Sequence, residues 1–362
     1  MVKVEEGVAL ASLTTMRVGG PAARVVTAES SDELIAAVRE VDEASEPLLV
    51  VSGGSNLLVS DEGFPGTVVQ VANHGVRVKE SSECGGVLVE VSAGESWDGF
   101  VAQAVDSGWA GVEALSGIPG LAGATPVQNV GAYGQDVSQT LARVRTWDRL
   151  RGEVRSFANV DCGFGYRHSM FKAQSHDGAP RFVVLDVTFQ LALADLSSPV
   201  AYQALADALN VSMGERVPLA DARAAVLSQR GLRGMVVDEA DHDTWSCGSF
   251  FTNPIMTAEE FEQLERRVGD HLGADVRPPR FPAGDGCVKS SAAWLIDRAG
   301  FGKGFGMPGP ASLSTKHTLA LTNRGSACAA DVIELARTIR DGVLDVFGVR
   351  LVNEPVMVGL SL

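Results

Sequence analysis

The chain contains few lysines and few cysteines, and its acidic residues outnumber its basic ones. Six of its 362 residues are lysine, and the formal net charge is -15 at pH 7. No global field would therefore draw the chain to nucleic acid or to an anionic membrane surface, so a phosphate-bearing ligand needs a local site. We expect neither a nucleic-acid nor a membrane partner.

The five cysteines are far apart in the sequence, and there is no Cys-x-x-Cys pair. This pattern indicates neither a disulfide framework nor a zinc site, and it fits a reduced cytoplasm. No second histidine lies at ligand spacing from His168, so we expect no metal site.

Long uninterrupted apolar segments are also missing. The first seven residues lack the apolar core of a signal peptide, so export is not expected. Residues 114–135 carry no charge over 22 residues, but five glycines and two prolines interrupt them. We interpret this stretch as a ligand loop rather than a membrane span.

What is present is an ordinary globular composition, with 45% apolar residues and a length that favours two or three compact units. In the first half, short β-rich runs alternate with amphipathic patterns, which predicts an α+β arrangement. One helix is predicted over residues 95–105, and another begins with Ser31 as its cap. The apolar face of that other helix contains Leu34, Ile35, Val38 and Val41. The predicted strands are 24–27, 48–51, 67–71, 87–91, 182–189 and two around Val144 and Val154.

The character of the sequence changes after residues 194–199, and a third unit is predicted beyond them. Residues 277–282 contain three prolines, so they cannot be helical and predict a surface connection. The predicted helices are 201–209, 221–229, 258–271, 288–298 and 329–347, followed by a strand over 349–352.

The first candidate site follows the predicted strand 48–51. Gly53 and Gly54 expose backbone N–H groups, and Ser55 and Asn56 add donors, which together resemble an anion nest for a pyrophosphate. The turn is neither a Gly-x-Gly-x-x-Gly motif nor a Walker loop, and Leu57 stands where a nucleophile elbow needs glycine. A plain tight turn is the alternative.

The second candidate is the loop over residues 116–134, which holds five glycines in nineteen residues. Such a loop is costly to order, so something must reward its fixed conformation. A flat aromatic ligand that the backbone approaches closely would do so. The alternative is a flexible loop, although flexible linkers are usually richer in serine and charge.

The third candidate is Arg167, which aromatic residues flank in Phe164-Gly165-Tyr166-Arg167. Aromatic surroundings desolvate a guanidinium group and strengthen its attraction for an anionic ligand. The alternative is an arginine stacked on a ring at the surface.

Two further segments carry groups that could move or attract charge. Residues 248–254 place the Ser249 hydroxyl between a glycine and two aromatics, where a water-excluded serine can protonate a strongly basic carbanion. A serine beside glycine is otherwise a turn residue. In Asn353-Glu354-Pro355, the proline holds Glu354 extended past a predicted strand, although a rim carboxylate would give the same pattern.

Taken together and in this order, these segments resemble the UDP-N-acetylenolpyruvoylglucosamine reductases, flavoenzymes of early peptidoglycan synthesis. The resemblance runs from about Thr14 to Gly359, and the set of motifs in one order is specific. The motifs are Gly53-Gly54-Ser55-Asn56, Ile118-Pro119-Gly120, residues 126–134, Phe164-Gly165-Tyr166-Arg167, residues 248–254 and Glu354-Pro355.

The resemblance implies an α+β fold, in which a two-lobed FAD-binding domain of the PCMH or vanillyl-alcohol-oxidase type precedes a smaller α+β substrate-binding domain. The expected parts are a first FAD-binding lobe (1–75), a second lobe (76–195), a connecting segment (196–228), the substrate-binding domain (229–348) and a C-terminal strand with Glu354 (349–362).

The resemblance also implies non-covalent FAD and NADPH as the hydride donor that reduces the flavin and leaves. The expected cofactor-binding residues are Gly53, Gly54, Ser55, Asn56, Leu57, Ser116, Ile118, Pro119, Gly120, Gly123, Thr125, Gln128, Asn129, Gly131, Ala132 and Tyr133.

The implied substrate is UDP-N-acetylglucosamine enolpyruvate, which is reduced to UDP-N-acetylmuramate, and a monomer is expected. Hydride reaches the vinyl methylene carbon and negative charge develops beside it, so a fixed cation and donors are needed there. Arg167 and Glu354 match the family residues that polarise this group, and Ser249 matches the proton donor. The residues that match substrate-binding positions are Tyr202, typical of the longer form of the family, Arg233 and Asn253.

Two residues depart from the family pattern, and a cysteine lies next to the matched serine. Arg233 stands where many members carry lysine for the diphosphate, which keeps the charge but changes the geometry. Ala124 replaces a serine of some relatives and removes one hydroxyl contact to the cofactor. Cys247, beside Ser249, would make the enzyme sensitive to thiol reagents if it were exposed in the cleft.

Two other functions stay open as alternatives. One is a different FAD-dependent oxidase or dehydrogenase of the same fold. That class often attaches flavin covalently through a histidine, and His74 could serve in this chain. Against it, the Ser249 and Glu354 motifs lie outside the FAD lobes and fit the reductase. The other is a non-catalytic UDP-sugar or flavin sensor, which would bind its ligand without turnover.

Overall fold

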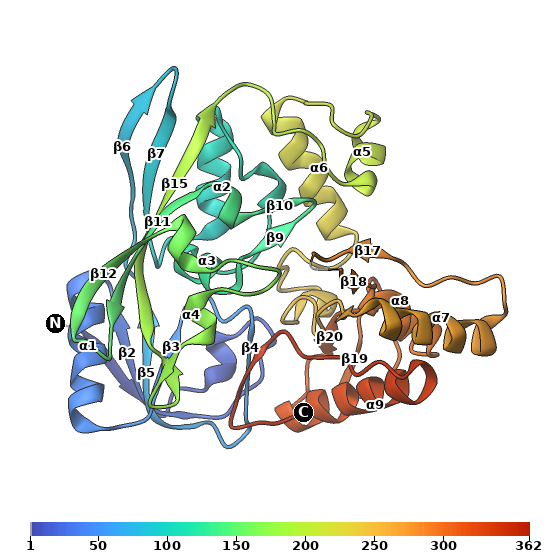
Figure 1. Ribbon diagram of the computed structural model, residues 1–362. Helices are drawn as coiled ribbons and strands as arrows, with labels where there is room; N and C mark the ends of the chain where they lie inside the picture. The colour runs from blue at the N-terminus through green and yellow to red at the C-terminus, as the bar shows by residue number, and fades with distance from the viewer. Residues whose placement is uncertain (1, 285) are drawn as a thin grey trace. The chain divides into compact units, whose positions relative to one another are not determined.

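The computed structural model describes residues 2–284 and 286–362, which form two compact units (Figure 1). The first unit comprises the chain up to Val8, Ala22–Gly54 and Phe64–Val236, and the second comprises Ala9–Pro21, Ser55–Gly63 and Val237–Leu362. Two short N-terminal segments therefore belong to the mainly C-terminal unit. The five functional parts expected from the sequence stay predictions.

The first unit begins with a four-stranded sheet in the order β1-β2-β5-β3. Its strands are β1 (Lys3–Glu6), β2 (Ala22–Ala28), β3 (Leu48–Val51) and β5 (Phe64–Val71). β2 and β3 run parallel to β5, whereas β1 is antiparallel to β2. Parallel strands need a crossover connection, and α1 (Ser31–Ala44) supplies it between β2 and β3.

The helix α1 confirms one predicted element, but its cap is Ser30 instead of Ser31. Ser30 Oγ accepts a hydrogen bond from Glu33 N at 3.2 Å, and Ser31 is the first helical residue. Two consecutive serines precede the apolar pattern, so the sequence offered two caps. The predicted apolar face packs into the core of the first unit through Leu34, Ile35, Val38 and Val41.

The second sheet of the first unit is antiparallel, in the order β12-β11-β15-β7-β6, and β8 pairs with the end of β15. Its strands are β6 (Val76–Ser82), β7 (Gly86–Ser92), β8 (Trp109–Ala110), β11 (Leu141–Asp148), β12 (Glu153–Ala158) and β15 (Phe182–Leu193). The strands predicted between residues 24 and 189 are confirmed. The helix predicted over 95–105 is α2 (Trp97–Asp106), capped by Ser96.

Both sheets pack around one hydrophobic core. At its centre, the rings of Trp97, Phe100 and Phe189 have centroids 5.4 to 5.8 Å apart. Trp97 Nε1 also donates a hydrogen bond to Leu115 O at 3.1 Å, which satisfies its buried polar atom. The start of the uncharged loop is therefore attached directly to the core.

The uncharged stretch is folded into short elements. They are η2 (Glu113–Leu115), η3 (Ala122–Ala124), α3 (Thr125–Gln128), β9 (Gly131–Ala132) and β10 (Gln135–Asp136), with η4 (Val137–Gln139) next. After β12 come η5 (Asn159–Cys162), α4 (Met170–Ala173), β13 (Ser175–His176) and β14 (Ala179–Pro180). Over the described residues, no helix has the length and apolar character needed to cross a bilayer.

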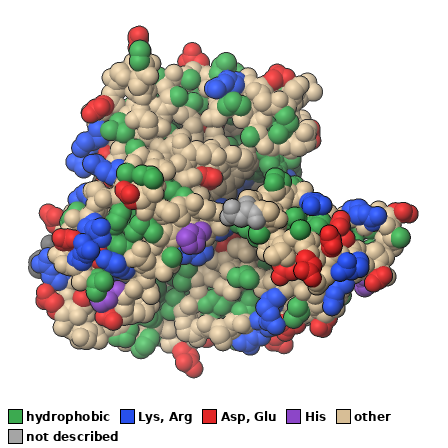
Figure 2. Space-filling model, in the orientation of Figure 1, with side chains coloured by type: hydrophobic (Ala, Val, Ile, Leu, Met, Phe, Trp, Pro, Cys, Tyr) green, Lys and Arg blue, Asp and Glu red, His purple; other side chains and the backbone are tan. Residues whose placement is uncertain are grey.

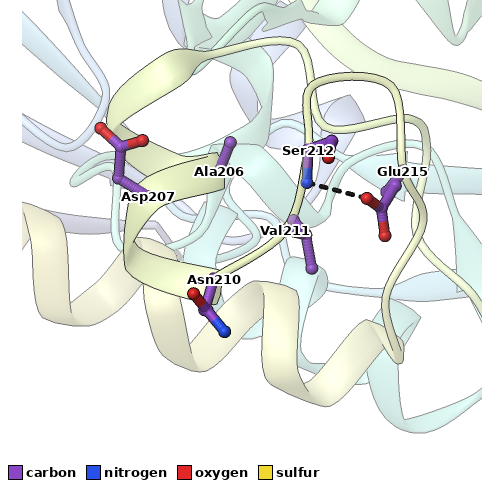
Figure 3. A pocket seen from close by; sticks show the side chains of 6 residues that line it. All are labelled: Ala206, Asp207, Asn210, Val211, Ser212 and Glu215. Atoms are coloured by element: carbon purple, nitrogen blue, oxygen red, sulfur yellow. Dashed lines mark hydrogen bonds between the residues drawn. The ribbon is translucent and has the colours of Figure 1, made fainter.

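The first unit ends with α5 (Gln203–Leu209) and α6 (Leu219–Gly231), which confirm two predicted helices. They bury Leu205, Ala206 and Val226 against each other. A shallow pocket of about 470 Å³ lies beside α5, where the Ser212 backbone N–H donates to the Glu215 carboxylate at 2.9 Å (Figure 3). The lining consists of Ala206, Asp207, Asn210, Val211, Ser212 and Glu215, which are different from the predicted site residues.

The second unit has its own core, built on α7 (Ala258–Leu272), α8 (Ala292–Arg298) and α9 (Ala329–Phe347). A capping box between Thr257 and Glu260 begins α7 at the predicted residue. Acidic and basic side chains are intermixed on the exposed face of α7 (Figure 2). The bounds of α9 are those predicted, because a long amphipathic pattern is a strong local signal.

The smaller elements of the second unit correct two predictions. The predicted helix over 288–298 is wrong at its start. Val288 and Lys289 pair with β16 (Ile255–Met256) and β17 (Phe281–Pro282), and α8 begins after its cap Ser291. The predicted strand over 349–352 is also wrong, because the strand β21 follows Pro355 and runs parallel to β4. These elements are η1 (Leu10–Leu13), β4 (Leu57–Val59), η6 (His242–Thr244), β16 (Ile255–Met256), β17 (Phe281–Pro282), β18 (Val288–Lys289), β19 (Ala311–Leu313), β20 (Leu321–Asn323) and β21 (Val356–Val358).

Asp148, the last residue of β11, forms an ion pair with Arg181. Asp148 is fully buried, and its carboxylate accepts hydrogen bonds from Arg181 at 2.8 and 2.9 Å. Burial opposes the charged form, but hydrogen bonds from Arg181 and Arg155 outweigh it and lower the pKa of the Asp148 carboxyl. Because the folded pKa lies below the unfolded one, this stabilisation is present above about pH 4 and is lost as the pH falls through the folded pKa.

We expect Asp148→Asn to lower the free energy of unfolding at pH 7 by about 2 kcal/mol, because it removes the buried anion that accepts charge-assisted hydrogen bonds from the partly exposed Arg181 and Arg155. Urea unfolding at pH 7 and pH 3 measures this, and the difference from the wild type should shrink at pH 3. Asp341→Asn, which removes an exposed partner of Arg340, is the control and should change stability little. An equal loss at both pH values would contradict the role of the charged carboxylate.

Candidate functional site

The turn after β3 touches the glycine-rich loop. A Cβ on Gly53 would lie 2.6 Å from the Cα of Gly120, so this close approach requires glycine. Gly54 has a φ of 59°, a left-handed conformation that glycine adopts without strain. Ser52 Oγ is buried and has no hydrogen-bond partner within residues 2–284 and 286–362. A buried hydroxyl needs such a partner, and a ligand at this turn would supply one.

The glycine-rich loop over residues 116–134 contacts the hydrophobic core of the first unit at several points. Gly123 has space only for hydrogen, because a Cβ there would lie 2.5 Å from the Cβ of Ala93. The Ser116 and Thr125 hydroxyls each donate at 2.7 Å to a backbone carbonyl three residues earlier. Ile118 packs against the hydrophobic core. These contacts fix the loop, so the alternative of a flexible loop does not hold.

Arg167 lies in a tight turn beside this loop. Gly165 and His168 exchange backbone hydrogen bonds of 3.1 and 3.2 Å, and Arg167 has a φ of 53°, which is uncommon for a residue other than glycine. Arg167 Nη2 donates to Gly131 O at 3.2 Å, and its guanidinium carbon lies 5.6 Å from the centre of the Tyr166 ring. Backbone conformations of this kind cluster at functional sites.

Asn129 attaches the Arg167 turn to the loop. It ends α3 with a φ of 43°, its Nδ2 donates to Gly165 O at 3.0 Å, and its Oδ1 accepts from Ser138 N at 3.2 Å. Ser169 Oγ adds a hydrogen bond to Val127 O at 2.7 Å. The predicted cofactor residue Asn129 therefore also has a structural role, because its side chain places Arg167.

Tyr133 connects the predicted cofactor and substrate residues. Tyr133 and Gly134 form the turn of the β9–β10 hairpin with φ values of 50° and 86°, and two positive φ values are typical of two-residue hairpin turns. The Tyr133 hydroxyl accepts a hydrogen bond from Arg233 Nη1 at 3.2 Å, and its ring meets Tyr202 edge-on at 5.5 Å. Three predicted residues from separate parts of the sequence are thus brought together.

A buried carboxylate explains why these segments meet. Glu113 is 2% exposed and accepts hydrogen bonds from Gln135 Nε2 at 3.0 Å and from Ser198 N at 2.6 Å. Gln135 belongs to the hairpin, and Ser198 precedes Tyr202 in the chain. Glu113 therefore joins the hairpin to the segment that carries Tyr202, a role that no local pattern reveals.

Arg230 is a candidate that the sequence predictions missed. It lies near the end of α6, its Nη2 donates to Met235 O at 2.7 Å, and burial lowers the pKa of its guanidinium to about 10. Its Nε is buried without a hydrogen-bond partner in the part of the chain that the structure describes. A half-buried cation whose buried Nε is an unused donor suits an anionic ligand. The spacing of Arg230 and Arg233 was the available sequence signal.

Ser249 belongs to the second unit, in a segment that backbone contacts hold on both sides. Gly248 precedes it with a φ of 71°, and Phe250 N donates to Leu319 O at 2.8 Å. Phe250 and Phe251 are fully buried, whereas Ser249 is half-buried. The two rings therefore anchor the segment and leave the hydroxyl at the boundary of the core.

Glu354 lies beside this segment. Glu354 N donates to Phe250 O at 2.8 Å, and Asn56 Nδ2 donates to Glu354 O at 3.4 Å. The structure therefore brings Ser249, Glu354 and the predicted cofactor residue Asn56 together in the second unit. Ser55 and Leu57 belong to the same unit, whereas Arg167 belongs to the first.

Asn253 and Cys247 flank the Ser249 segment. Asn253 Oδ1 accepts a hydrogen bond from Ala292 N at 3.0 Å, so the start of α8 orients its amide. Cys247 is 5% exposed, and its thiol donates to Leu57 O at 3.3 Å. Burial raises the pKa of this thiol to about 12. The exposure that thiol sensitivity requires is therefore absent at Cys247.

The comparisons with known proteins follow the same division of the chain. Residues 22–158 match the model of an FAD binding domain, and residues 238–358 match the model of the C-terminal domain of UDP-N-acetylenolpyruvoylglucosamine reductase. The UDP-N-acetylenolpyruvoylglucosamine reductase of Thermobifida fusca is 57% identical over 98% of both chains. That of Streptomyces coelicolor is 56% identical over 98% of this chain and 90% of its own length.

A solved structure is similar over the whole length. The crystal structure of UDP-N-acetylenolpyruvylglucosamine reductase from Thermus caldophilus has a TM-score of 0.65 and 25% identity, and the match covers 99% of this chain and 100% of that one. The α+β fold, an FAD-binding domain followed by a reductase C-terminal domain, is thereby confirmed.

We expect Cys247 to resist alkylation in the folded protein, because its thiol is buried and its pKa of about 12 leaves almost no thiolate at pH 8. Iodoacetamide treatment followed by peptide mapping measures this. The exposed Cys84 is the control and should be modified first, whereas Cys247 should react only after urea unfolding. Modification of Cys247 at the same rate as Cys84 would show that its segment opens in solution.

Proposed function

Because this chain belongs to the family of UDP-N-acetylenolpyruvoylglucosamine reductases, we propose that Arg167, Ser249 and Glu354 carry its catalysis. The enzyme is an FAD-dependent UDP-N-acetylmuramate dehydrogenase that uses NADPH and acts in peptidoglycan precursor synthesis. The observation that carries this conclusion is the 57% identity to a reductase over 98% of the chain.

The residues around the Gly53 turn fit FAD. The buried Ser52 hydroxyl needs a partner, and the contact of Gly53 with Gly120 lets a ligand approach the backbone there. We propose that this turn and the loop from Ser116 to Tyr133 hold the cofactor, and, from the family resemblance alone, that Ser55, Asn56 and Leu57 also bind it. When bound there, FAD would supply hydride chemistry for the enolpyruvyl methylene carbon of the substrate, with NADPH as the source of the hydride.

Ser249 is proposed to complete the reduction as a proton donor. Addition of hydride to the methylene carbon leaves an electron pair on the adjacent carbon, which is conjugated with the carboxylate. The Ser249 O–H bond breaks as the new C–H bond forms on that carbon, and the alkoxide then takes a proton from solvent. A serine can act in this way because the carbanion is much more basic than ordinary acceptors.

Arg167 and Glu354 are proposed to polarise the enolpyruvyl group. Arg167 supplies a fixed cation for the charge that develops in the carboxylate, and its hydrogen bond to Gly131 O restrains the guanidinium. The backbone hydrogen bond from Glu354 N to Phe250 O places Glu354 near the proton donor. Each of these contacts restrains its residue within its own unit, and the assignment of both residues to the enolpyruvyl group rests on the family resemblance.

Tyr202, Arg233 and Asn253 are proposed to bind the substrate. Arg233 is oriented by its hydrogen bond to the Tyr133 hydroxyl, and Tyr202 is 48% exposed, so a ligand has access to its ring. Arginine in place of lysine can hold a diphosphate with two parallel hydrogen bonds. Arg230 adds a second cation near Tyr133.

We also propose that the enzyme is a cytoplasmic monomer. Its five cysteines are all free thiols in the structure, which suits a reducing compartment. Light scattering during size-exclusion chromatography tests the monomer.

We expect Ser249→Ala to leave the reduction of flavin by NADPH unchanged and to slow reoxidation by UDP-N-acetylglucosamine enolpyruvate by about 10²- to 10⁴-fold, as loss of a general acid requires. Anaerobic stopped-flow absorbance of the flavin measures both half-reactions. Ser290→Ala removes a buried hydroxyl of the same unit that donates to Pro279 O at 2.8 Å, and as the control it should leave both rates near the wild type.

Other outcomes separate the alternative functions. An oxidase would reoxidise its flavin with oxygen but not with the enolpyruvyl compound, and a sensor would bind flavin that NADPH does not bleach. Equal slowing of both half-reactions in Ser249→Ala would assign Ser249 to folding or flavin binding.

We expect Gly53→Ala to purify with little flavin, because its methyl group would lie 2.6 Å from the Cα of Gly120 and push the turn away from the loop. The ratio of the visible absorbance of oxidised flavin to the absorbance of the protein measures FAD content. Gly302→Ala is the matched control, because a Cβ there meets nothing within 4 Å among the described residues. Full flavin content in Gly53→Ala would contradict the proposed site.

A further inference from the structure

A hydroxyl near the N-terminus contacts the backbone just before Ser249. Thr15 Oγ1 donates a hydrogen bond of 2.7 Å to Ser246 O, across a separation of 231 residues in the sequence. Ser246 is 5% exposed, and both residues belong to the second unit. The Ser246 carbonyl is thereby held by a side chain from the other end of the chain.

Ser246 passes this restraint to the residues around Ser249. Gly248 N donates to Ser246 Oγ at 3.1 Å, and Gly248 has a φ of 71°. On the other side of Ser249, Phe250 N donates to Leu319 O at 2.8 Å. Ser249 therefore lies between two residues whose backbone N–H groups are held by hydrogen bonds. Ser246 accepts the first of these bonds, and the Thr15 hydroxyl in turn holds the Ser246 carbonyl.

Further contacts keep the Thr15 loop against the same segment. Asn323 N donates to Trp245 O at 3.0 Å, and Asn323 Nδ2 donates to Met16 O at 3.1 Å. The guanidinium carbon of Arg17 lies 4.1 Å from the centre of the Trp245 ring. Asn323 and Arg17 act on Trp245, whereas the Thr15 hydroxyl contacts Ser246 itself.

We propose that Thr15 is a positioning residue for Ser249, which fixes the hydroxyl of the proton donor through Ser246 and Gly248. The proposal rests on the proposed role of Ser249. Proton transfer to carbon depends steeply on geometry, and a displacement of about 1 Å can cost about 10²-fold in rate. Thr15 therefore acts on the protonation of substrate and leaves the reduction of flavin untouched.

Thr14 offers a matched control for Thr15. The two residues are adjacent and of the same type, but Thr14 Oγ1 donates to Val18 O at 3.2 Å, within its own loop. Thr14 is also the more buried of the two, with 7% exposed. Its replacement removes a hydroxyl of the same loop while the bond to Ser246 stays in place.

The test compares Thr15→Val, Thr15→Ser and Thr14→Val as flavin-loaded full-length proteins, with Ser249→Ala as the reference. We expect Thr15→Val to slow flavin reoxidation by UDP-N-acetylglucosamine enolpyruvate by about 10- to 100-fold, because the donor is misplaced rather than lost. Reduction by NADPH should stay at the wild-type rate. Thr15→Ser, which keeps the hydroxyl, should restore reoxidation, and Thr14→Val should leave both half-reactions near the wild type.

A second variant guards against simple loss of folding. Ser246→Ala removes the acceptor of Gly248 N but keeps the carbonyl that Thr15 contacts. It should show the same selective slowing of reoxidation. Thermal unfolding of each variant measures its stability. A loss of stability can then be told apart from a selective slowing of flavin reoxidation.

The outcomes separate this proposal from the function on which it rests. If Ser249→Ala slows reoxidation selectively but Thr15→Val and Ser246→Ala behave like Thr14→Val, the positioning role of Thr15 is overturned while the role of Ser249 stands. If Ser249→Ala fails to separate the half-reactions, the proposed role of Ser249 as proton donor fails first. Equal slowing of both half-reactions in Thr15→Val would show a merely structural role.

Discussion

The backbone hydrogen bond from Glu354 N to Phe250 O is the contact on which the site in the second unit depends. It fixes Glu354 beside the Ser249 segment, and the bond from Val356 N to Asn56 O continues the same connection into the parallel pair β21–β4. Residues 56 and 354 lie near opposite ends of the chain. The site therefore forms only when the long chain segment between them closes into a loop, which costs conformational entropy. Burial of the hydrophobic core of the second unit offsets this cost.

The first unit depends instead on close contacts that only small or strained residues permit. Gly53 meets Gly120 and Gly123 meets Ala93 at distances that exclude a Cβ. Tyr133 has a left-handed backbone that costs free energy, and the hydrogen bonds that converge on Glu113 hold its hairpin in place. A rigid core under the loop lets these conformations persist, and a flat cofactor can then approach the backbone closely.

The accuracy of the sequence predictions follows the range of the interactions involved. The helix α9 was predicted with its bounds because its apolar pattern and its ends are local. The sequence prediction starts a helix at Val288, yet the pairing of Val288 with β16 and β17 makes it part of a strand. The strand expected before Glu354 lies after it, because its partner β4 is about 300 residues away and leaves no trace in the local pattern.

By itself, the sequence determined the α+β class, seven strands of the two main sheets of the first unit and the family, because periodicity and colinear motifs are properties of order along the chain. It also predicts Arg167, Ser249 and Glu354 as the residues that carry the chemistry. Tertiary structure alone decided that Tyr133 meets Tyr202 and Arg233, that Cys247 is buried, and that Thr15 contacts Ser246. These relations join residues far apart in the chain, and packing in three dimensions selects them.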